Sequence, residues 1–151
     1  MLRRIVAFFV AAAVMVVLGS AAQSLFVQHA WSAAAGQADG TAAVAIPFAD
    51  RILWAGHDLV GMILPYGAIT SIALLIACLA AGALARFTGR RALVFGVAGA
   101  LAILAMFTAM KMLVGSVGIF GARGALGLAA QASVGLLAGA LFARLTRRGK
   151  S

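Results

Sequence analysis

The sequence predicts an all-α integral membrane protein, a bundle of four transmembrane helices in a single domain over residues 1–151. Of the 151 residues, 65% are apolar and only 10% are charged, whereas soluble domains are nearer half apolar and a quarter charged. A soluble protein of this length has too little interior to cover so many apolar side chains. The apolar residues also fall in four runs of about 20, the length that crosses a bilayer as a helix. These runs lack the alternation of barrel strands.

The first apolar run covers about residues 5–26 and follows Arg3 and Arg4. MLRR, the apolar stretch and GSAAQS also resemble a secretory signal with a small-residue cleavage region, in which cleavage after Ala22 would leave three helices. Since the sequence retains Met1, we expect an uncleaved anchor. The orientation of the other helices in the membrane is the same whether or not the first helix is cleaved.

A long outer loop is expected over residues 27–58. The part from Val27 to Pro47 is rich in Ala and Gly and has no clear period. Trp31 and Trp54 flank it as expected anchors in the headgroup layer. After Pro47, apolar residues recur at helical spacing, which predicts either a short helix in the outer interface or an outward extension of the second helix, with Gly56 as the joint.

The second helix is expected over about residues 59–85. Tyr66 to Ala85 is already 20 residues, about 30 Å at the helical rise, which is enough to cross the hydrocarbon. Pro65 can kink or break the helix at this outer boundary. The third helix is expected over about 92–114 and the fourth over about 124–143, joined outside by a glycine-rich turn.

The fourth helix carries a pattern of small residues. Gly127, Gln131, Gly135 and Gly139 recur every four residues, and small residues at this spacing let two helix backbones approach closely. Gln131 lies inside the hydrocarbon layer, where its amide needs a partner. We interpret that partner as an interhelical hydrogen bond within the monomer, with another subunit or a bound ligand as the alternative.

Basic residues orient the bundle, because positive residues mark the cytoplasmic side of a membrane protein. Arg51, Lys111 and Arg123 lie on the outer side with all three acidic residues, and the other nine of the twelve basic residues lie on the inner side. These nine are Arg3, Arg4, Arg86, Arg90, Arg91, Arg144, Arg147, Arg148 and Lys150. We therefore expect a multi-pass protein of the bacterial inner membrane with both termini in the cytoplasm. Its basic residues would set topology and touch anionic lipid headgroups, and no nucleic acid partner is expected.

Polar residues gather at the outer ends of the second to fourth helices. They are Arg51, His57, Asp58, Tyr66, Lys111 and Arg123. His57 would lie about 43 Å from Arg86 along a continuous helix, at the edge of the headgroup zone. We interpret the six residues first as a clamp of ion pairs and hydrogen bonds between helix ends. The alternative is a small site for a lipid headgroup, an anionic solute or a quinone.

The sequence contains few residues that could act as a nucleophile, a general base or a metal ligand, and we do not expect an enzyme. His57 and Asp58 are adjacent, so they point about 100° apart on a helix, and no nucleophile motif accompanies them. Cys78 is single, and no Cys/His spacing suggests a metal site. A haem would need His29 and His57, the only two histidines, as axial ligands. We expect no cofactor and no metal.

Three short patterns carry a resemblance. With the R-x(5)-H spacing of Arg51 and His57, a His-Asp-Leu opening of the second helix, and Gly19-Ser20 near the end of the first, the chain resembles small, uncharacterised four-helix inner-membrane proteins of bacteria. The resemblance covers the frame of the chain and implies that fold but no activity.

The small-residue helix faces and the sparse catalytic equipment favour an accessory or assembly subunit of a membrane complex. Its expected partners are membrane lipids and other membrane protein subunits, or a second copy of the chain. The alternatives are a small-molecule or lipid binder or transporter at the outer polar residues, and a quinone or haem anchor subunit.

Overall fold

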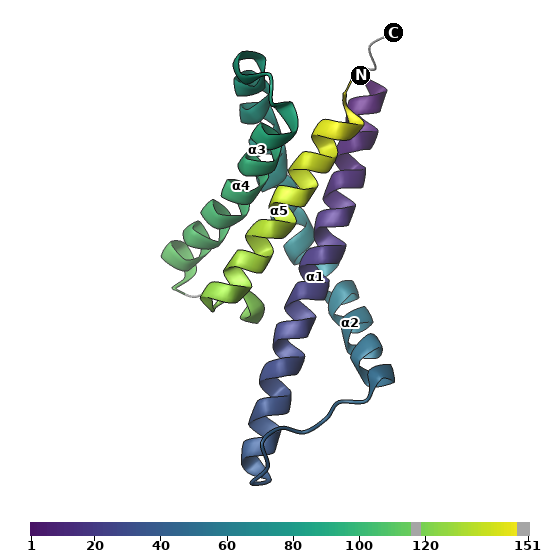
Figure 1. Ribbon diagram of the computed structural model, residues 1–151, viewed down its shortest axis with the longest axis vertical. Coiled ribbons are helices and arrows are strands. Elements are labelled where there is room, and N and C mark those ends of the chain that lie inside the picture. Colours follow the sequence, from purple (N-terminus) through teal and green to yellow (C-terminus); the bar gives the residue numbers. More distant parts are fainter. Residues whose placement is uncertain (116–118, 148–151) are drawn as a thin grey trace.

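The computed structural model describes residues 1–115 and 119–147, and its regular elements in these ranges are helices. They are α1 (Leu2–Ala38), α2 (Phe48–Ile63), α3 (Pro65–Thr88), α4 (Arg91–Val114), the short 3-10 helix η1 (Phe120–Ala122) and α5 (Ala125–Leu145). Within the described residues, α1, α3, α4 and α5 are long and apolar enough to cross a membrane. The expected fold class, an all-α four-helix membrane bundle, is therefore confirmed (Figure 1).

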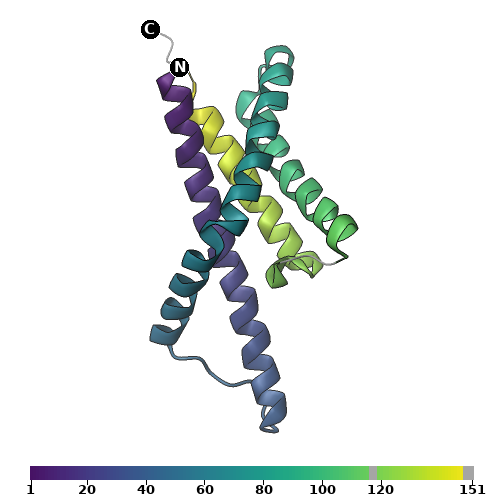
Figure 2. The same cartoon turned by 180° about the vertical axis from the view of Figure 1, so that it is seen from behind.

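The four long helices form a ring in which each packs against two neighbours. α5 lies between α1 and α4, and α3 contacts both α1 and α4. The amino terminus, the end of α5 and the turn between α3 and α4 lie at one end of the molecule, as the front and back views show (Figures 1 and 2). We call this the basic end. It carries Arg3, Arg4, Arg86, Arg90, Arg91, Arg144 and Arg147, while Arg148 and Lys150 lie outside the described residues.

α1 is much longer than expected, and this corrects the predicted outer loop over residues 27–58. The helix continues to Ala38 and α2 begins at Phe48, so that only residues 39–47 are non-helical. The reason is local, because the segment AWSAAAGQA holds five alanines, and Ala is the strongest helix former. The short loop then folds back along α1, where the Val44 amide donates a hydrogen bond to the Ser32 carbonyl at 3.1 Å.

The second apolar run is divided at Leu64, between α2 and α3. Pro65 occupies the first turn of α3, because proline has no N–H to donate and its ring displaces the preceding turn. Gly56, the expected joint, lies inside α2 instead. At its other end α3 stops at Gly89, whose φ of 63° is the left-handed conformation that glycine adopts most readily.

The closest approach between α4 and α5 is made by glycines. Gly99 of α4 and Gly135 of α5 face each other so closely that a Cβ atom on either would collide with the carbonyl oxygen of the other. Gly139 lies in the same way against the carbonyl oxygen of Phe95. Two members of the four-residue pattern in α5 therefore touch the backbone of α4, which is the contact that small residues permit in membranes.

The carboxyl end of α5 is held by arginines from two other helices. Arg3 of α1 donates from Nε to the Leu145 carbonyl at 3.0 Å and from Nη2 to the Arg147 carbonyl at 2.7 Å. Arg91 of α4 donates from Nη2 to the Thr146 hydroxyl at 3.0 Å. The last carbonyl groups of a helix carry partial negative charge, so these cations fix α1, α4 and α5 to one another at the basic end.

Candidate functional site

The six outer polar residues predicted to gather do not meet in one place. Arg51, His57 and Asp58 lie on α2, which packs against α1 and α3. Lys111 lies near the end of α4, on the far side of α1 and α5 from α2 (Figure 1). Within residues 1–115 and 119–147, no ion pair joins Asp58 to Arg51 or to Lys111. The expected cluster is not assembled, because α2 packs against α1 and α3, whereas Lys111 belongs to α4, which packs against α3 and α5.

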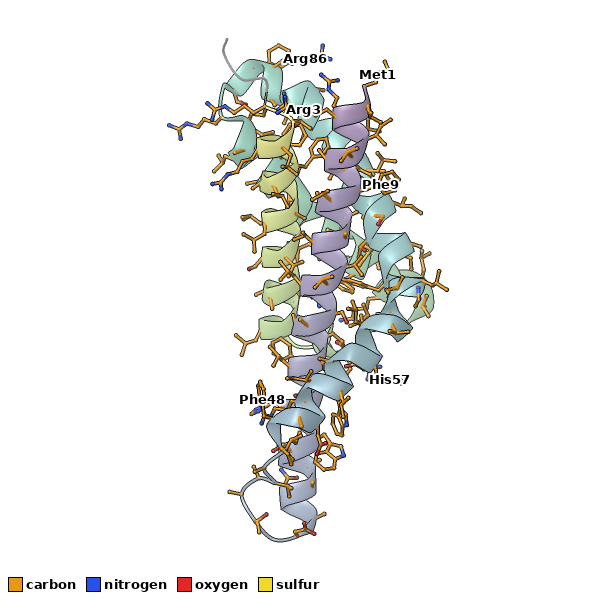
Figure 3. The ribbon with its side chains drawn as sticks, turned by 90° about the vertical axis from the view of Figure 1, so that its right-hand side faces the viewer. Met1, Arg3, Phe9, Phe48, His57 and Arg86 are labelled. Carbon is orange, nitrogen blue, oxygen red and sulfur yellow. The ribbon has the colours of Figure 1, made fainter. Side chains whose placement is uncertain are left out.

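Each of these residues has its own surroundings. His57 is exposed on α2 (Figure 3), and Lys111 is exposed on α4. Arg51 donates from Nε to the Ile46 carbonyl at 3.2 Å and so braces the loop before α2. Arg123 lies over a phenyl ring, 5.6 Å from the centroid of Phe120. His29, the second candidate haem ligand, is exposed on α1.

Tyr66 points into the bundle. Its side chain is only 4% exposed, and its hydroxyl donates to Gln131 Oε1 at 2.7 Å. Gln131 Nε2 in turn donates to the Gly19 carbonyl at 3.0 Å. Gly19 makes room for this arrangement, because a Cβ atom there would collide with the Tyr66 hydroxyl. One buried chain of hydrogen bonds therefore joins α1, α3 and α5, and the Gln131 amide has its partners inside the monomer.

α1 carries a row of buried polar side chains, here called the α1 stripe. Its members are Ser20, Gln23, Ser24 and Gln28. Spacings of three and four residues place them on one side of the helix. Gln23 Oε1 accepts a hydrogen bond from the Gly121 amide, which holds η1 against α1. Gln28 Nε2 donates to Ser24 Oγ and to the Arg51 carbonyl, each at 3.0 Å, and so ties the start of α2 to α1.

The α1 stripe is missed by the interpretation of the sequence, although a signal for it is present. Ser20, Ser24, Gln28 and Ser32 are four residues apart, which is a helical period. The end of the first helix near Phe26 and the loop expected from residue 27 onward hide that period. In the part of the chain that the structure describes, Ser20 Oγ and Gln28 Oε1 are buried atoms of the stripe without a hydrogen-bond partner.

The chemistry of these polar groups is hydrogen bonding. The α1 stripe and the Tyr66–Gln131 pair contain hydroxyl and amide groups, with no carboxylate or imidazole among them. Nor do any three His, Cys, Asp or Glu side chains of residues 1–115 and 119–147 lie together in a way that could hold a metal ion. The polar groups of the interior therefore join helices.

Likeness to known proteins does not point to an activity. Comparison of the chain with protein-family models, with curated proteins and with solved structures finds no match. The surfaces that the fold leaves uncovered are therefore the basis for a functional proposal.

Proposed function

We propose that this protein is an accessory subunit of a complex in the bacterial inner membrane and that α2 binds a partner membrane protein. The observation that carries the proposal is an exposed apolar surface on α2, remote from the basic end (Figure 3). We call it the α2 face. Its side chains are between 50% and 80% exposed, and they are Phe48, Ile52, Leu53, Val60, Ile63 and Leu64.

The depth of α2 favours a protein partner over lipid. If α1 enters the hydrocarbon at Ile5, about 20 residues bring it to the outer boundary near Leu25. The rest of α1, up to Ala38, extends about 20 Å further, past a headgroup layer of about 5–8 Å. α2 lies beside this part of α1, since the rings of Trp31 and Trp54 are 5.4 Å apart. The first half of α2 therefore lies in the outer headgroup layer and beyond it.

α2 has two apolar sides, and one of them has no partner within the described chain. Leu59 and Met62 are half-buried toward the rest of the protein, and Met62 packs against the hydrophobic core. Leu53 and Val60 are seven residues apart and therefore share a side of the helix other than that of Leu59 and Met62. A helix held in place by one apolar side needs no second one for folding, and contiguous apolar surface in water marks interaction sites.

The proposal includes the orientation of the chain. Arg3, Arg86 and Arg144 belong to the basic end, and basic residues are retained on the cytoplasmic side. We infer that this end faces the cytoplasm. The α2 face then acts at the outer surface of the inner membrane, where it meets the outer part of a partner subunit.

Copurification from native membranes in mild detergent tests this function. We expect a partner polypeptide at fixed stoichiometry with the unaltered chain and its loss from the double variant Leu53→Gln/Val60→Gln. The matched control is Asp50→Asn/His57→Gln, which alters the polar side of the same helix and should retain the partner. A stable lone monomer, or a partner that survives the Leu53/Val60 substitutions, contradicts the proposal.

A further inference from the structure

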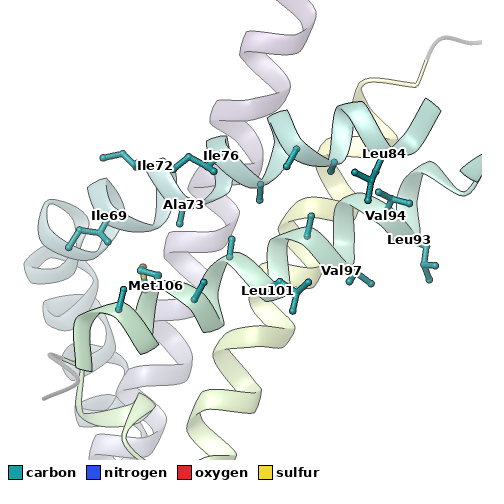
Figure 4. A pocket seen from close by; sticks show the side chains of 17 residues that line it. Ile69, Ile72, Ala73, Ile76, Leu84, Leu93, Val94, Val97, Leu101 and Met106 are labelled. Carbon is teal, nitrogen blue, oxygen red and sulfur yellow. The ribbon is translucent and has the colours of Figure 1, made fainter. Parts of the chain in front are cut away.

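α3 and α4 leave an open groove between them, on the side of α4 opposite its contact with α5. Figure 4 shows it from close by. The groove has a volume of about 840 Å³, and every residue that lines it is Ala, Val, Ile, Leu or Met. Buried Ala77 and Ala81 belong to its floor. Its rims are larger exposed side chains, Ile72, Ile76 and Leu84 on α3 and Leu93, Val97 and Leu101 on α4.

The groove begins at the basic end and runs past the middle of the membrane. Leu84 and Leu93 line it next to the turn between α3 and α4, and Ile69 lines it near the other end. Leu84 and Ile69 are about 22 Å apart at the helical rise. One leaflet contributes about 15 Å of hydrocarbon. A chain that enters from the basic end can therefore lie in the groove over the full depth of its leaflet.

Positive charge lies next to this end of the groove. Arg86 and Arg90 flank the turn and are exposed, and neither side chain is hydrogen bonded within residues 1–115 and 119–147. Arg91 and Arg3, by contrast, are engaged with the end of α5. The amino terminus of α4 adds partial positive charge. Its first turn contains no acidic residue that would offset that charge. The three acidic residues of the chain, Asp39, Asp50 and Asp58, belong to the loop after α1 and to α2, away from this end.

We propose that the groove binds an anionic phospholipid of the adjoining leaflet, with an acyl chain between α3 and α4 and its phosphate at Arg86 and Arg90. This inference goes beyond the accessory function, because it concerns other helices and the opposite end of the molecule. The position of the charges favours a phospholipid as the occupant. Its negative headgroup would meet the arginines, and its apolar acyl chain would meet the groove. A transmembrane helix of a partner would fill the groove but brings no anion of its own to either guanidinium group.

Native mass spectrometry of the delipidated full chain in detergent tests the charge requirement. Dioleoyl phosphatidylglycerol and dioleoyl phosphatidylcholine have the same acyl chains and differ in headgroup charge. We expect one phosphatidylglycerol to bind in preference to phosphatidylcholine. Arg86→Gln/Arg90→Gln should weaken that binding about thirtyfold, since each cation near an anionic headgroup contributes about 1 kcal/mol and 1.4 kcal/mol is tenfold.

The matched charge control is Arg4→Gln/Arg144→Gln. Both arginines are exposed at the basic end, so the variant loses the same net charge outside the groove. We expect it to bind phosphatidylglycerol like the unaltered chain. Equal weakening in both double variants would show diffuse attraction to a charged surface and would overturn the proposal, as would equal binding of the two lipids.

Filling the groove tests the position of the acyl chain. Ala80 and Ala109 are both exposed groove residues, about 9 Å from Arg86 and about 27 Å from Arg91 along their helices. Ala80→Phe should abolish binding of phosphatidylglycerol, whereas Ala109→Phe, which adds the same ring beyond the reach of the leaflet, should retain it. Comparable elution of both variants from size exclusion establishes that they fold.

Two outcomes contradict the lipid site. Binding that Ala80→Phe leaves unchanged places the lipid elsewhere. Ala80 can also be replaced by a photoreactive amino acid and crosslinked in native membranes. Crosslinks to a polypeptide, with no lipid adduct, would show that a protein helix occupies the groove. The variant Leu53→Gln/Val60→Gln should still bind phosphatidylglycerol, so failure of the lipid site and failure of the α2 face are distinguished.

Discussion

The hydroxyl of Tyr66 lies 2.7 Å from Oε1 of Gln131, and this hydrogen bond joins α3 to α5, two helices that otherwise have few contacts. Gln131 continues the connection to the Gly19 carbonyl of α1. Polar groups in hydrocarbon must find partners within the protein. Since the same bonds cannot form after a shift of any of the three helices, the Tyr66–Gln131 pair fixes their relative heights.

Removal of the Tyr66 hydroxyl is expected to destabilise the bundle. Tyr66→Phe leaves Gln131 Oε1 without its donor, and interhelical hydrogen bonds in membranes contribute about 0.6–2 kcal/mol. The free energy of unfolding in mixed micelles measures the loss, and a double-mutant cycle with Gln131→Leu isolates the pair. Ser133→Ala is the control, because Ser133 is exposed and bonds the Ala129 carbonyl of its own helix. Strict additivity of the two interior substitutions argues against the coupling.

A methyl group at Gly135 is expected to separate α4 from α5. Gly135→Ala places a Cβ atom against the Gly99 carbonyl, and overpacking of this kind costs about 1–3 kcal/mol. Gly82→Ala is the matched control, since Gly82 lies inside α3 with open space around it. Ala is a better helix former by about 1 kcal/mol, so the control should be neutral or stabilising in the same unfolding measurement. Equal effects would exclude a close α4–α5 contact.

Loss of the Arg3 side chain is expected to loosen the end of α5. Arg3→Gln removes the donors to the Leu145 and Arg147 carbonyls, and a cation at a helix carboxyl end contributes about 0.3–1 kcal/mol. Hydrogen exchange of the last turn of α5 should accelerate, with little change in α3. Arg4→Gln loses the same charge from a neighbouring exposed position and should leave that exchange as it is. Acceleration in both variants would attribute the effect to charge alone.

The proposed orientation predicts a labelling pattern for two engineered thiols. In a Cys78→Ala background, Ala42→Cys lies in the loop before α2 and Thr88→Cys lies at the turn between α3 and α4, and both positions are exposed. An impermeant thiol reagent should label Ala42→Cys in spheroplasts and Thr88→Cys only after the membrane is opened. The reverse pattern would place the basic end outside.

The spans of the bundle are predictable from hydropathy, because burial in lipid requires about 20 apolar residues whatever the neighbours are. α4 and α5 accordingly lie close to the expected ranges, whereas α3 begins at Pro65, six residues after the expected start. The outer part of α1 is not predictable in this way, because its Ala, Gly and Ser residues give little contrast in hydropathy. Its helical state depends on alanine propensity and on the loop that folds back to the Ser32 carbonyl.

The candidate site shows a second limit. Counting helical rise from Arg86 gives the approximate height of Tyr66 and His57, but it does not give the direction in which each side chain points. Tyr66 faces inward to Gln131 and His57 faces outward. Nine residues of helix place the two about half a turn apart, but which of the two sides faces the bundle depends on how the helices pack. The distance of Lys111 from α2 likewise follows from the order in which the helices pack.

α1 runs from Leu2 to Ala38 without an interruption and contains no proline, so it is a single rod about 55 Å long. Arg3 attaches one end to α5, and the returning loop and α2 are attached near the other. Sharp helix bending occurs at proline, at Gly/Ser pairs or at π-bulges, and the one such pair in α1, Gly19–Ser20, is where Tyr66 and Gln131 pack against the helix. One continuous helix therefore connects the segment that carries α2 with the basic end, and a displacement of α2 would reach Arg3 through the helix at Gly19–Ser20.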